Sequence, residues 1–150
     1  METLLHKKKP AVRQLVNTTK VPVRFSEVDA LGIVWHGHYL KFFEDGREAF
    51  GREHELGYLD FYKNKFAVPL VKINVDFKKT VKYGDEVKII TTYIDSPAAK
   101  INFSYEIYRE SDNELVAVGE SVQVFMNLDH ELYITVPDFF AEWKKKYLPG

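Results

Sequence analysis

A short segment near the N-terminal end gathers side chains that are able to do chemistry, namely Asp29, Trp35, His36 and His38, with Gly37 among them. Gly37 comes at the start of a predicted helix, where unpaired N–H groups and the helix dipole favour negative charge developing on an oxygen. A carboxylate a few residues before such amides provides a base or nucleophile opposite an oxyanion site. Asp29 and the helix start are therefore the minimal equipment for acyl transfer.

Each of these residues also has a simpler interpretation. Asp29 could accept hydrogen bonds from the backbone of its own turn and do nothing else, as Asp often does in loops. His36 and His38 could indicate a metal, but residues two apart at a helix start point to different sides and no third ligand is evident, so we expect no metal and no cofactor. Trp35 is more often a core or pocket-wall residue than a direct participant in a reaction. Glu44, taken alone, would be an ordinary exposed helix residue.

The composition removes most other mechanisms. The chain of 150 residues has no cysteine, which excludes disulfides, thiolate metal sites and a cysteine nucleophile. It has no Gly-x-Ser-x-Gly elbow, no phosphate-binding loop and no dinucleotide fingerprint. If the protein is an enzyme, a carboxylate mechanism is the option that remains.

Length and charge limit the class of protein further. A length of 150 residues fits a single domain spanning residues 1–150. The net charge is −1, whereas a nucleic-acid-binding domain is typically strongly basic. No apolar run approaches the ~20 residues of a membrane helix, and the N-terminus lacks the apolar stretch of a secretory signal. These features predict a cytoplasmic protein without a nucleic-acid partner or a membrane span.

The first half of the chain predicts one strand and one long helix. Residues 1–16 read as a lead-in segment, and alternation over Val21 to Phe25 predicts a strand. A helix is expected from Tyr39 to near Gly57, with Gly46 on its apolar stripe, where the missing side chain would allow close approach to another element. The other residues of that stripe are Tyr39, Phe42, Phe43 and Phe50.

The second half predicts four strands joined by short turns and a final helix. The strands are expected over residues 69–78, 87–94, 101–108 and 116–126, after a short helical stretch at 60–65. In the last strand the residues of one face are Val116, Val118, Val122, Val124 and Met126, with Glu120 interrupting them. A capping-box pattern at Thr135 to Asp138 predicts the C-terminal helix, about 136–147.

Short turns between successive strands indicate antiparallel pairing. A single long helix beside such a sheet must bury its apolar stripe against one face. The predicted fold is therefore α+β: a five-stranded antiparallel sheet wrapped around a long central helix, with a core of about residues 17–130 and a C-terminal helix.

The segment from Asp29 to His36 (Asp-Ala-Leu-Gly-Ile-Val-Trp-His), followed by Tyr39 and by Phe42-Phe43-Glu44, resembles the signature of hot-dog-fold acyl-CoA thioesterases. The similarity is to the 4-hydroxybenzoyl-CoA thioesterase type, including the bacterial branch associated with the Tol-Pal system. It covers about residues 20–128 and includes the order of strands and helix.

The resemblance implies a function and assigns roles to residues. It implies hydrolysis of an acyl-CoA thioester, with Asp29 as nucleophile or general base and His36 supplying a backbone N–H to the thioester carbonyl. Family members are dimers or dimers of dimers, with active sites at the subunit interface, so a homo-oligomer, even a homotetramer, is expected. The resemblance, together with the interpretation of Trp35 as a pocket-wall residue, assigns five substrate-binding positions: Trp35, Tyr39, Glu44, Lys72 and Lys100. The two lysines are assigned to the coenzyme A phosphates.

The chain also departs from the family pattern. Leu31 stands before the glycine where a smaller residue or proline is common, and His38 is unusual. These departures bear on the preferred acyl group more than on the reaction. An acyl carrier protein ester as substrate, an acyl-thioester hydratase or dehydratase using His36 and Glu44, and a non-catalytic acyl-CoA-binding protein remain alternatives.

Overall fold

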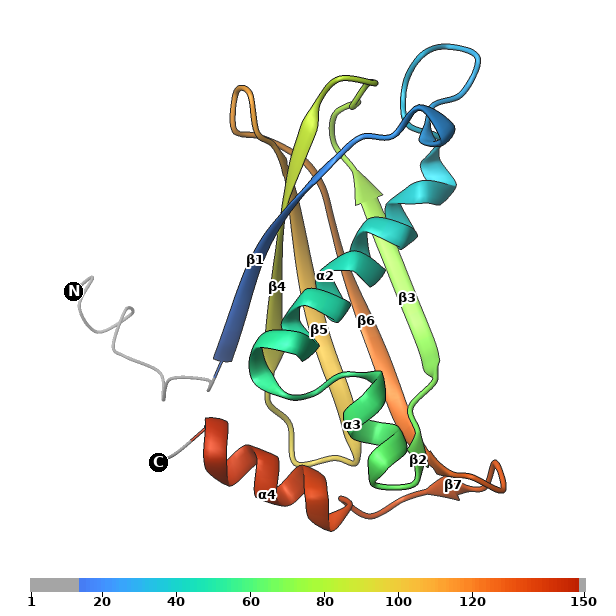
Figure 1. The fold of residues 1–150 in the computed structure, drawn as a ribbon, viewed down its shortest axis with the longest axis vertical. Coiled ribbons are helices and arrows are strands. Elements are labelled where there is room, and N and C mark those ends of the chain that lie inside the picture. The colour runs from blue at the N-terminus through green and yellow to red at the C-terminus, as the bar shows by residue number, and fades with distance from the viewer. Residues whose placement is uncertain (1–13, 149–150) are drawn as a thin grey trace, which may run out of the picture.

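A long helix lies across one face of a curved antiparallel sheet in the computed structural model, which describes residues 14–148 (Figure 1). The strands are β1 (Gln14–Pro22), β2 (Phe66–Ala67), β3 (Leu70–Phe77), β4 (Glu86–Ile94), β5 (Lys100–Arg109), β6 (Glu114–Asn127) and β7 (Leu132–Tyr133). The helices are α2 (Tyr39–His54), α3 (Tyr58–Lys63) and α4 (Asp138–Tyr147), with 3-10 turns η1 (Phe25–Glu27) and η2 (His36–His38).

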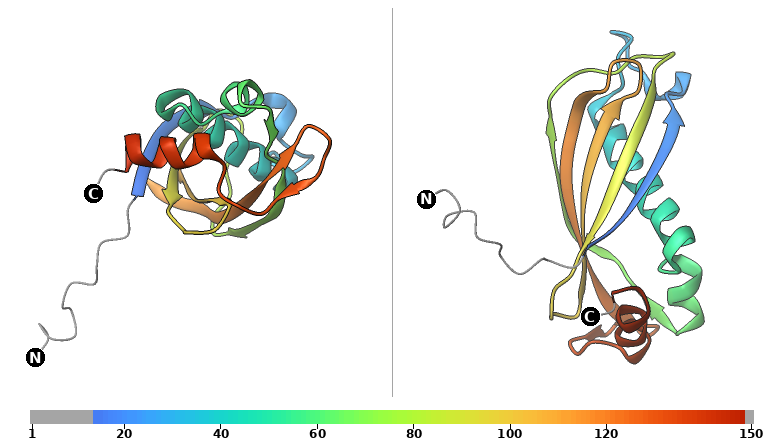
Figure 2. Two further views of the ribbon diagram at one scale, coloured as in Figure 1. Left: turned by 90° about the horizontal axis from the view of Figure 1, so that it is seen from below. Right: turned by 90° about the vertical axis from the view of Figure 1, so that its left-hand side faces the viewer.

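The sheet has the order β1-β4-β5-β6, with β3 on the far side of β6. Every pairing between these strands is antiparallel, as the short turns predict. The two-residue strands β2 and β7 pair with the last residues of β6. The five long strands around α2 confirm the predicted α+β hot-dog architecture, and Figure 2 shows the sheet curling around the helix.

The aromatic stripe of α2 forms the centre of the core, as its helical spacing predicts. Phe42, Phe43 and Phe50 are completely buried, and Phe43 stacks on Tyr105 of β5 with ring centroids 4.3 Å apart. Gly46 faces β4, where an added Cβ would lie 2.3 Å from Oγ1 of Thr91. The predicted close approach at Gly46 is therefore confirmed.

Strand β1 differs from its prediction in position. It starts at Gln14, inside the segment expected to be a lead-in, and ends at Pro22. The prediction of a strand over Val21 to Phe25 is therefore wrong for its second half, where Phe25 begins the turn η1. The start of the strand was missed because its residues alternate polar and apolar only weakly. The rest of the expected lead-in, residues 1–13, lies outside the described part of the chain.

The prediction that Val116 shares one face of β6 with Val118, Val122, Val124 and Met126 is wrong for Val116. A register shift between Ile107 and Tyr108 of β5 leaves Val116 without a partner in the β5–β6 pairing. Beyond this bulge the residues that face α2 are Ala117, Gly119 and Ser121, all buried. Val118, Glu120 and Val122 therefore lie on the opposite face of the sheet, because one extra residue reverses the alternation.

Helix α4 closes the lower end of the molecule in Figures 1 and 2. Its indole Trp143 donates a hydrogen bond to the carbonyl oxygen of His54 at the end of α2 (2.6 Å). The expected capping box is absent, because Pro137 occupies the N-cap position and no side chain caps the helix. The helix therefore begins at Asp138, two residues later than predicted.

Candidate active site

Asp29 lies in the tight loop that connects β1 to the start of α2. Its Oδ1 accepts hydrogen bonds from the N–H groups of Leu31 (2.8 Å) and Ile33 (3.4 Å). Its own N–H donates to the carbonyl oxygen of Ile33, and Gly32, at φ +80°, donates back to the carbonyl of Asp29. The positive φ is accessible to glycine without strain, which explains this residue at the tip. One carboxylate oxygen thus holds the loop, while no hydrogen bond to Oδ2 is formed within residues 14–148.

The start of the helix offers amides that are close to this loop in the sequence and have no backbone acceptor among residues 14–148. The backbone hydrogen bonds of the first turn begin with the N–H of His38, which donates to the carbonyl of Trp35. The N–H groups of His36 and Gly37 precede this bond, at the positive end of the helix dipole. A Cβ on Gly37 would lie 2.1 Å from the Trp35 ring, so the indole lies directly against the glycine. These amides are the predicted donors to a developing oxyanion.

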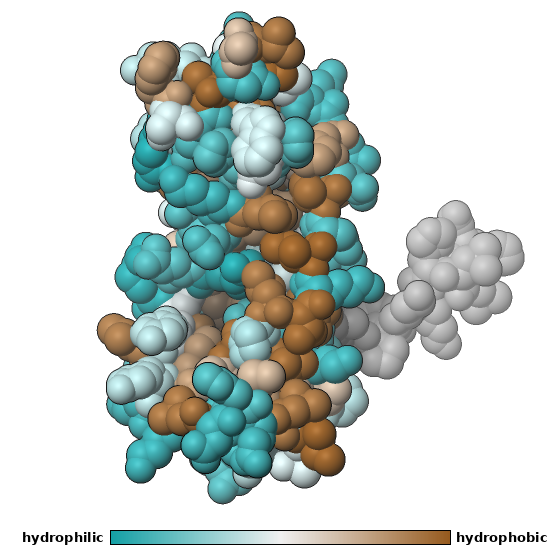
Figure 3. Space-filling view, turned by 90° about the vertical axis from the view of Figure 1, so that its right-hand side faces the viewer, coloured by the Kyte–Doolittle hydropathy of each residue, from teal (hydrophilic) through white to brown (hydrophobic). Residues whose placement is uncertain are grey.

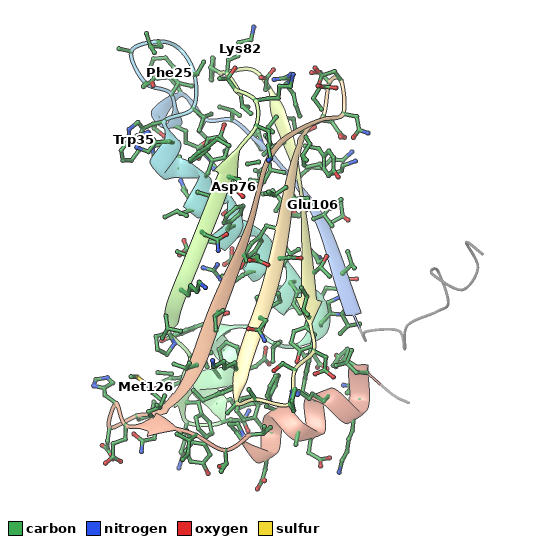
Figure 4. All side chains as sticks on the ribbon, turned by 180° about the vertical axis from the view of Figure 1, so that it is seen from behind. Phe25, Trp35, Asp76, Lys82, Glu106 and Met126 are labelled. Atoms are coloured by element: carbon green, nitrogen blue, oxygen red, sulfur yellow. The ribbon has the colours of Figure 1, made fainter. Side chains whose placement is uncertain are left out.

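Aromatic side chains surround the helix start. The Trp35 ring lies 4.8 Å from that of His36, and Phe77 at the end of β3 lies 6.4 Å from His36 and 5.0 Å from Tyr39. Trp35 and Phe77 are half exposed, so they present apolar surface at this end of the molecule. Figure 4 shows Trp35, Phe25 and Lys82 at this end of the molecule, with Met126 at the other.

The predicted substrate-binding residue Tyr39 is 3% exposed and belongs to the core. Burial raises the pKa of its phenol, an effect that the charge of Arg109 opposes. The side chain packs edge to face against Phe42 and Phe77. Tyr39 therefore supports the wall of the site from behind, and Phe77 presents the surface.

A groove of about 970 Å³ runs along α2 toward α3 and β2. Its apolar lining residues include Leu56, Phe61, Phe66, Val68, Phe103 and Met126, and its charged residues include Glu44, Arg47, Glu48 and Arg52. Glu44 is the predicted site residue that lines this groove. It lies six residues after His38, which places it about 9 Å along the helix axis from the helix start. An acyl group of ordinary size spans this distance.

The two lysines predicted to hold coenzyme A phosphates lie away from the helix start. Lys72 is exposed on β3 and lines a small hollow of about 220 Å³ on the opposite face of the sheet from α2, together with Asn102 and Glu120. Lys100 begins β5, at the end of the sheet opposite the Asp29 loop (Figure 1). A single chain therefore brings together Asp29, Trp35 and His36, and leaves both lysines apart from them.

Two residues near the loop were missed by sequence reasoning. Phe77 is one of the aromatic side chains around the helix start. The sequence could have indicated it through its position as the last apolar residue in the alternation of a predicted strand. Glu27 is fully buried two residues before Asp29. A glutamate in a polar loop sequence gives no sign of burial, which depends on cations supplied from elsewhere in the fold.

Within residues 14–148 no three His, Cys, Asp or Glu side chains are arranged to hold a metal ion. Over the same residues no helix is both long and apolar enough to cross a membrane.

The chain was compared with known families, sequences and structures. Residues 23–144 match the sequence profile of the thioesterase-like superfamily. The chain belongs to this superfamily. The match includes the Asp29 loop, α2 and most of the sheet. Membership together with the relatives below makes the protein a thioester hydrolase.

The superfamily relatives include enzymes named for acyl-CoA substrates. YneP of Bacillus subtilis (strain 168), which carries the provisional name acyl-CoA thioesterase, is 30% identical over 132 residues, covering 88% of this chain and 95% of its own. The 1,4-dihydroxy-2-naphthoyl-CoA hydrolase of Thermosynechococcus vestitus is 23% identical, over 82% of this chain and 84% of its own. The structure of 4-hydroxybenzoyl-CoA thioesterase from Pseudomonas sp. strain CBS-3 superimposes with a TM-score of 0.74 at 22% identity, covering 87% of this chain and 99% of that one, which supports the fold.

Proposed function

We propose that the protein hydrolyses acyl-CoA thioesters at the loop between β1 and α2. Asp29 acts as nucleophile or as general base for water, and the N–H of His36 donates a hydrogen bond to the thioester oxygen as negative charge develops on it. The thiolate of coenzyme A is a good leaving group, so a strong general acid is not required. The names of the relatives support a coenzyme A ester as substrate.

The observation that carries this proposal is that the two oxygens of the Asp29 carboxylate have different environments. Oδ1 is held by two backbone N–H groups of the loop, which fixes the orientation of the side chain. Oδ2 makes no hydrogen bond within residues 14–148 and is available to a water molecule or a carbonyl carbon. A carboxylate that is both oriented and free on one side meets the geometric requirement for a base or nucleophile.

The groove along α2 is the proposed site of the acyl group. It begins at Glu44, about 9 Å along the helix from the helix start. Its mainly apolar walls and its volume are typical of a small-molecule site. Trp35 and Phe77 then form the apolar wall where the thioester enters.

We also propose that the active protein is a dimer formed through β3. This strand pairs with β6 on one side and with no other strand of residues 14–148 on its second side. On this strand Val71 is more than half exposed and Phe77 is half exposed. Figure 3 shows hydrophobic side chains gathered along this side of the molecule. A long, apolar, unpaired edge strand is a template for pairing with a second chain.

A two-fold axis would pair two copies of β3 antiparallel. The start of β3 in one protomer would then lie beside the end of β3 in the other, next to Phe77 and the helix start. Lys72 lies near the start of the strand, so pairing moves it toward the second protomer's Asp29 loop. This arrangement favours Lys72 over Lys100 as a contact for the coenzyme A phosphates.

The proposed reaction is tested with Asp29→Asn in a thiol-release assay over short, long and aromatic acyl-CoAs. The amide oxygen of asparagine can still accept the loop hydrogen bonds, while the charge is lost, so we expect kcat to fall by about 100-fold or more with the fold intact. Asp129→Asn, at an exposed turn between β6 and β7, is the matched control and should behave as wild type. Near wild-type hydrolysis of every active ester by Asp29→Asn would show that the mechanism is wrong.

The dimer is tested by sedimentation velocity. Val71→Asp places a charge on the free edge of β3 and is expected to give a monomer with lower activity. Ile134→Asp, which alters an equally apolar and more exposed residue away from β3, is expected to stay assembled. A monomeric wild-type protein that is fully active would refute the proposal.

A further inference from the structure

Glu27 is the only charged side chain that is fully buried among residues 14–148, with 0% exposure. It lies in η1, two residues before Asp29, and it plays no part in the reaction proposed above. A carboxylate removed from water is unfavourable unless cations and hydrogen-bond donors replace the solvent. Its partners therefore show what the burial achieves.

The carboxylate of Glu27 joins the loop to helix α2. Oε1 accepts the backbone N–H of Arg24 (2.7 Å), and Oε2 accepts the Arg24 guanidinium (3.0 Å). Oε2 also pairs with the ammonium of Lys41 (3.4 Å), which belongs to the first turn of α2. Burial alone would raise the pKa of this carboxyl, but the hydrogen bonds from Arg24 and the charges of Arg24 and Lys41 lower it overall. Glu27 is therefore ionised at neutral pH.

The backbone of Glu27 makes a second connection across the same loop. Its carbonyl oxygen accepts the N–H of Trp35, the residue before His36 (2.9 Å). A bridge between Val28 and Val34 lies immediately inside this bond. Side chain and backbone together thus fix both ends of the loop, with Asp29 at one end and the amide of His36 at the other.

We propose that Glu27 is a positioning residue for thioester hydrolysis, which fixes the Asp29 carboxylate relative to the oxyanion amides at the start of α2. This inference rests on the proposed function of that site. Glu27 touches neither substrate nor reacting atoms; it acts through the loop and through Lys41. A displacement of about 1 Å between reacting groups can lower a rate by about 100-fold, so such a tie has a large effect on catalysis.

The first experiment is Glu27→Gln, which keeps the shape of the side chain and removes its charge. The amide would face the cations of Arg24 and Lys41, so we expect the loop to shift. The expected result is a fall in kcat of about 10- to 100-fold, with KM for the acyl-CoA changed less than about threefold. Phe140→Leu is the control for lost stability, because Phe140 is fully buried in α4 at the far end of the molecule; it should lower Tm and leave kcat unchanged.

The second experiment does not depend on activity. Hydrogen exchange should accelerate at the amides of Asp29 and Trp35 in Glu27→Gln, and remain as in wild type at these amides in Phe140→Leu. Lys41→Met gives a variant with little risk to folding, because the lysine side chain is 46% exposed. It should lower kcat less than Glu27→Gln does, and should have no further effect when the two are combined, since both break the same tie.

The outcomes separate the two proposals. If the wild-type protein releases thiol from no acyl-CoA, the proposed function fails, whatever the exchange data show. If the wild-type protein is active, Glu27→Gln with wild-type kcat or with unchanged exchange at Asp29 and Trp35 overturns the positioning role. Independent, additive effects of Glu27→Gln and Lys41→Met on kcat would overturn it as well.

Discussion

The contact between α2 and β4 at Gly46 gives a prediction with a definite sign. A Cβ at this position would lie 2.3 Å from Oγ1 of Thr91 and 2.9 Å from Cγ2 of Ile89. Both distances are well below a normal contact, and both neighbours sit on a central strand of the sheet. Gly46→Ala therefore forces the helix and the strand apart.

Two opposing effects determine the size of the change. Alanine is favoured over glycine within a helix by about 1 kcal/mol. Overpacking a core costs about 1–3 kcal/mol, and the upper end applies here because the fully buried Phe42 and Phe50 on the same helix face lose contacts when the helix moves. The expected net loss is about 1–2 kcal/mol, which corresponds to a fall in Tm of about 2–8 °C for a chain of this length.

Urea denaturation of Gly46→Ala, Thr91→Ala and the double variant measures this effect. Oγ1 of Thr91 is buried and has no hydrogen-bond partner among residues 14–148, so its removal makes room and leaves no other described polar group unpaired. We expect a favourable coupling energy of about 1 kcal/mol in the double variant. A Gly46→Ala protein as stable as wild type, or a coupling energy near zero, would refute the reasoning that the two elements touch at this glycine.

Three further changes follow from buried polar groups. Tyr105→Phe removes the hydroxyl that binds Arg47 (2.9 Å) and Ser121 (2.6 Å), and should lower the free energy of unfolding by about 1–3 kcal/mol in a urea titration. Burial raises the pKa values of Tyr39 and Tyr105, so the unfolded chain loses these protons first and stability should fall as pH rises above about 10; Tyr105→Phe should flatten that fall. Burial also raises the pKa of Asp45, whose Oδ2 has no hydrogen-bond partner in the described part of the chain, so Asp45→Asn should raise Tm at neutral pH and lose this advantage in acid.

Much of the fold could be predicted from the sequence, because the spacing of apolar residues within one helix or strand determines which of its faces is buried. The stripe of Phe42, Phe43 and Phe50 identifies the buried face of α2 without any knowledge of the sheet. The alternation of Ile101, Phe103, Tyr105 and Ile107 likewise identifies the buried face of β5, and all four are buried. In both elements, side-chain burial alone decides which residues face inward.

Which face of β6 points inward could not be predicted in this way, because the inner face carries small residues and not the most hydrophobic ones. A Cβ on Gly119 would lie 2.5 Å from the Phe43 ring and 2.4 Å from the carbonyl oxygen of Asn74. The large rings of α2 therefore require small residues on the facing strand, and the valines are left on the other side. A pattern based on hydrophobicity selects the valines, since it contains no information about the element on the opposite side of the core.

For the candidate site, the sequence offers two interpretations of Asp29, a structural one and a catalytic one. The two are compatible, because each concerns a different oxygen of the carboxylate. The simpler one, a carboxylate that accepts hydrogen bonds from its own turn, is confirmed for Oδ1. The catalytic one concerns the second oxygen and remains a proposal. The turn hydrogen bonds hold the side chain in one orientation, which lowers the entropy that must be lost before reaction. In the proposed mechanism, the structural role of Oδ1 therefore prepares Oδ2 for catalysis. Asparagine can keep the first role and loses the charge, which makes it the informative substitution.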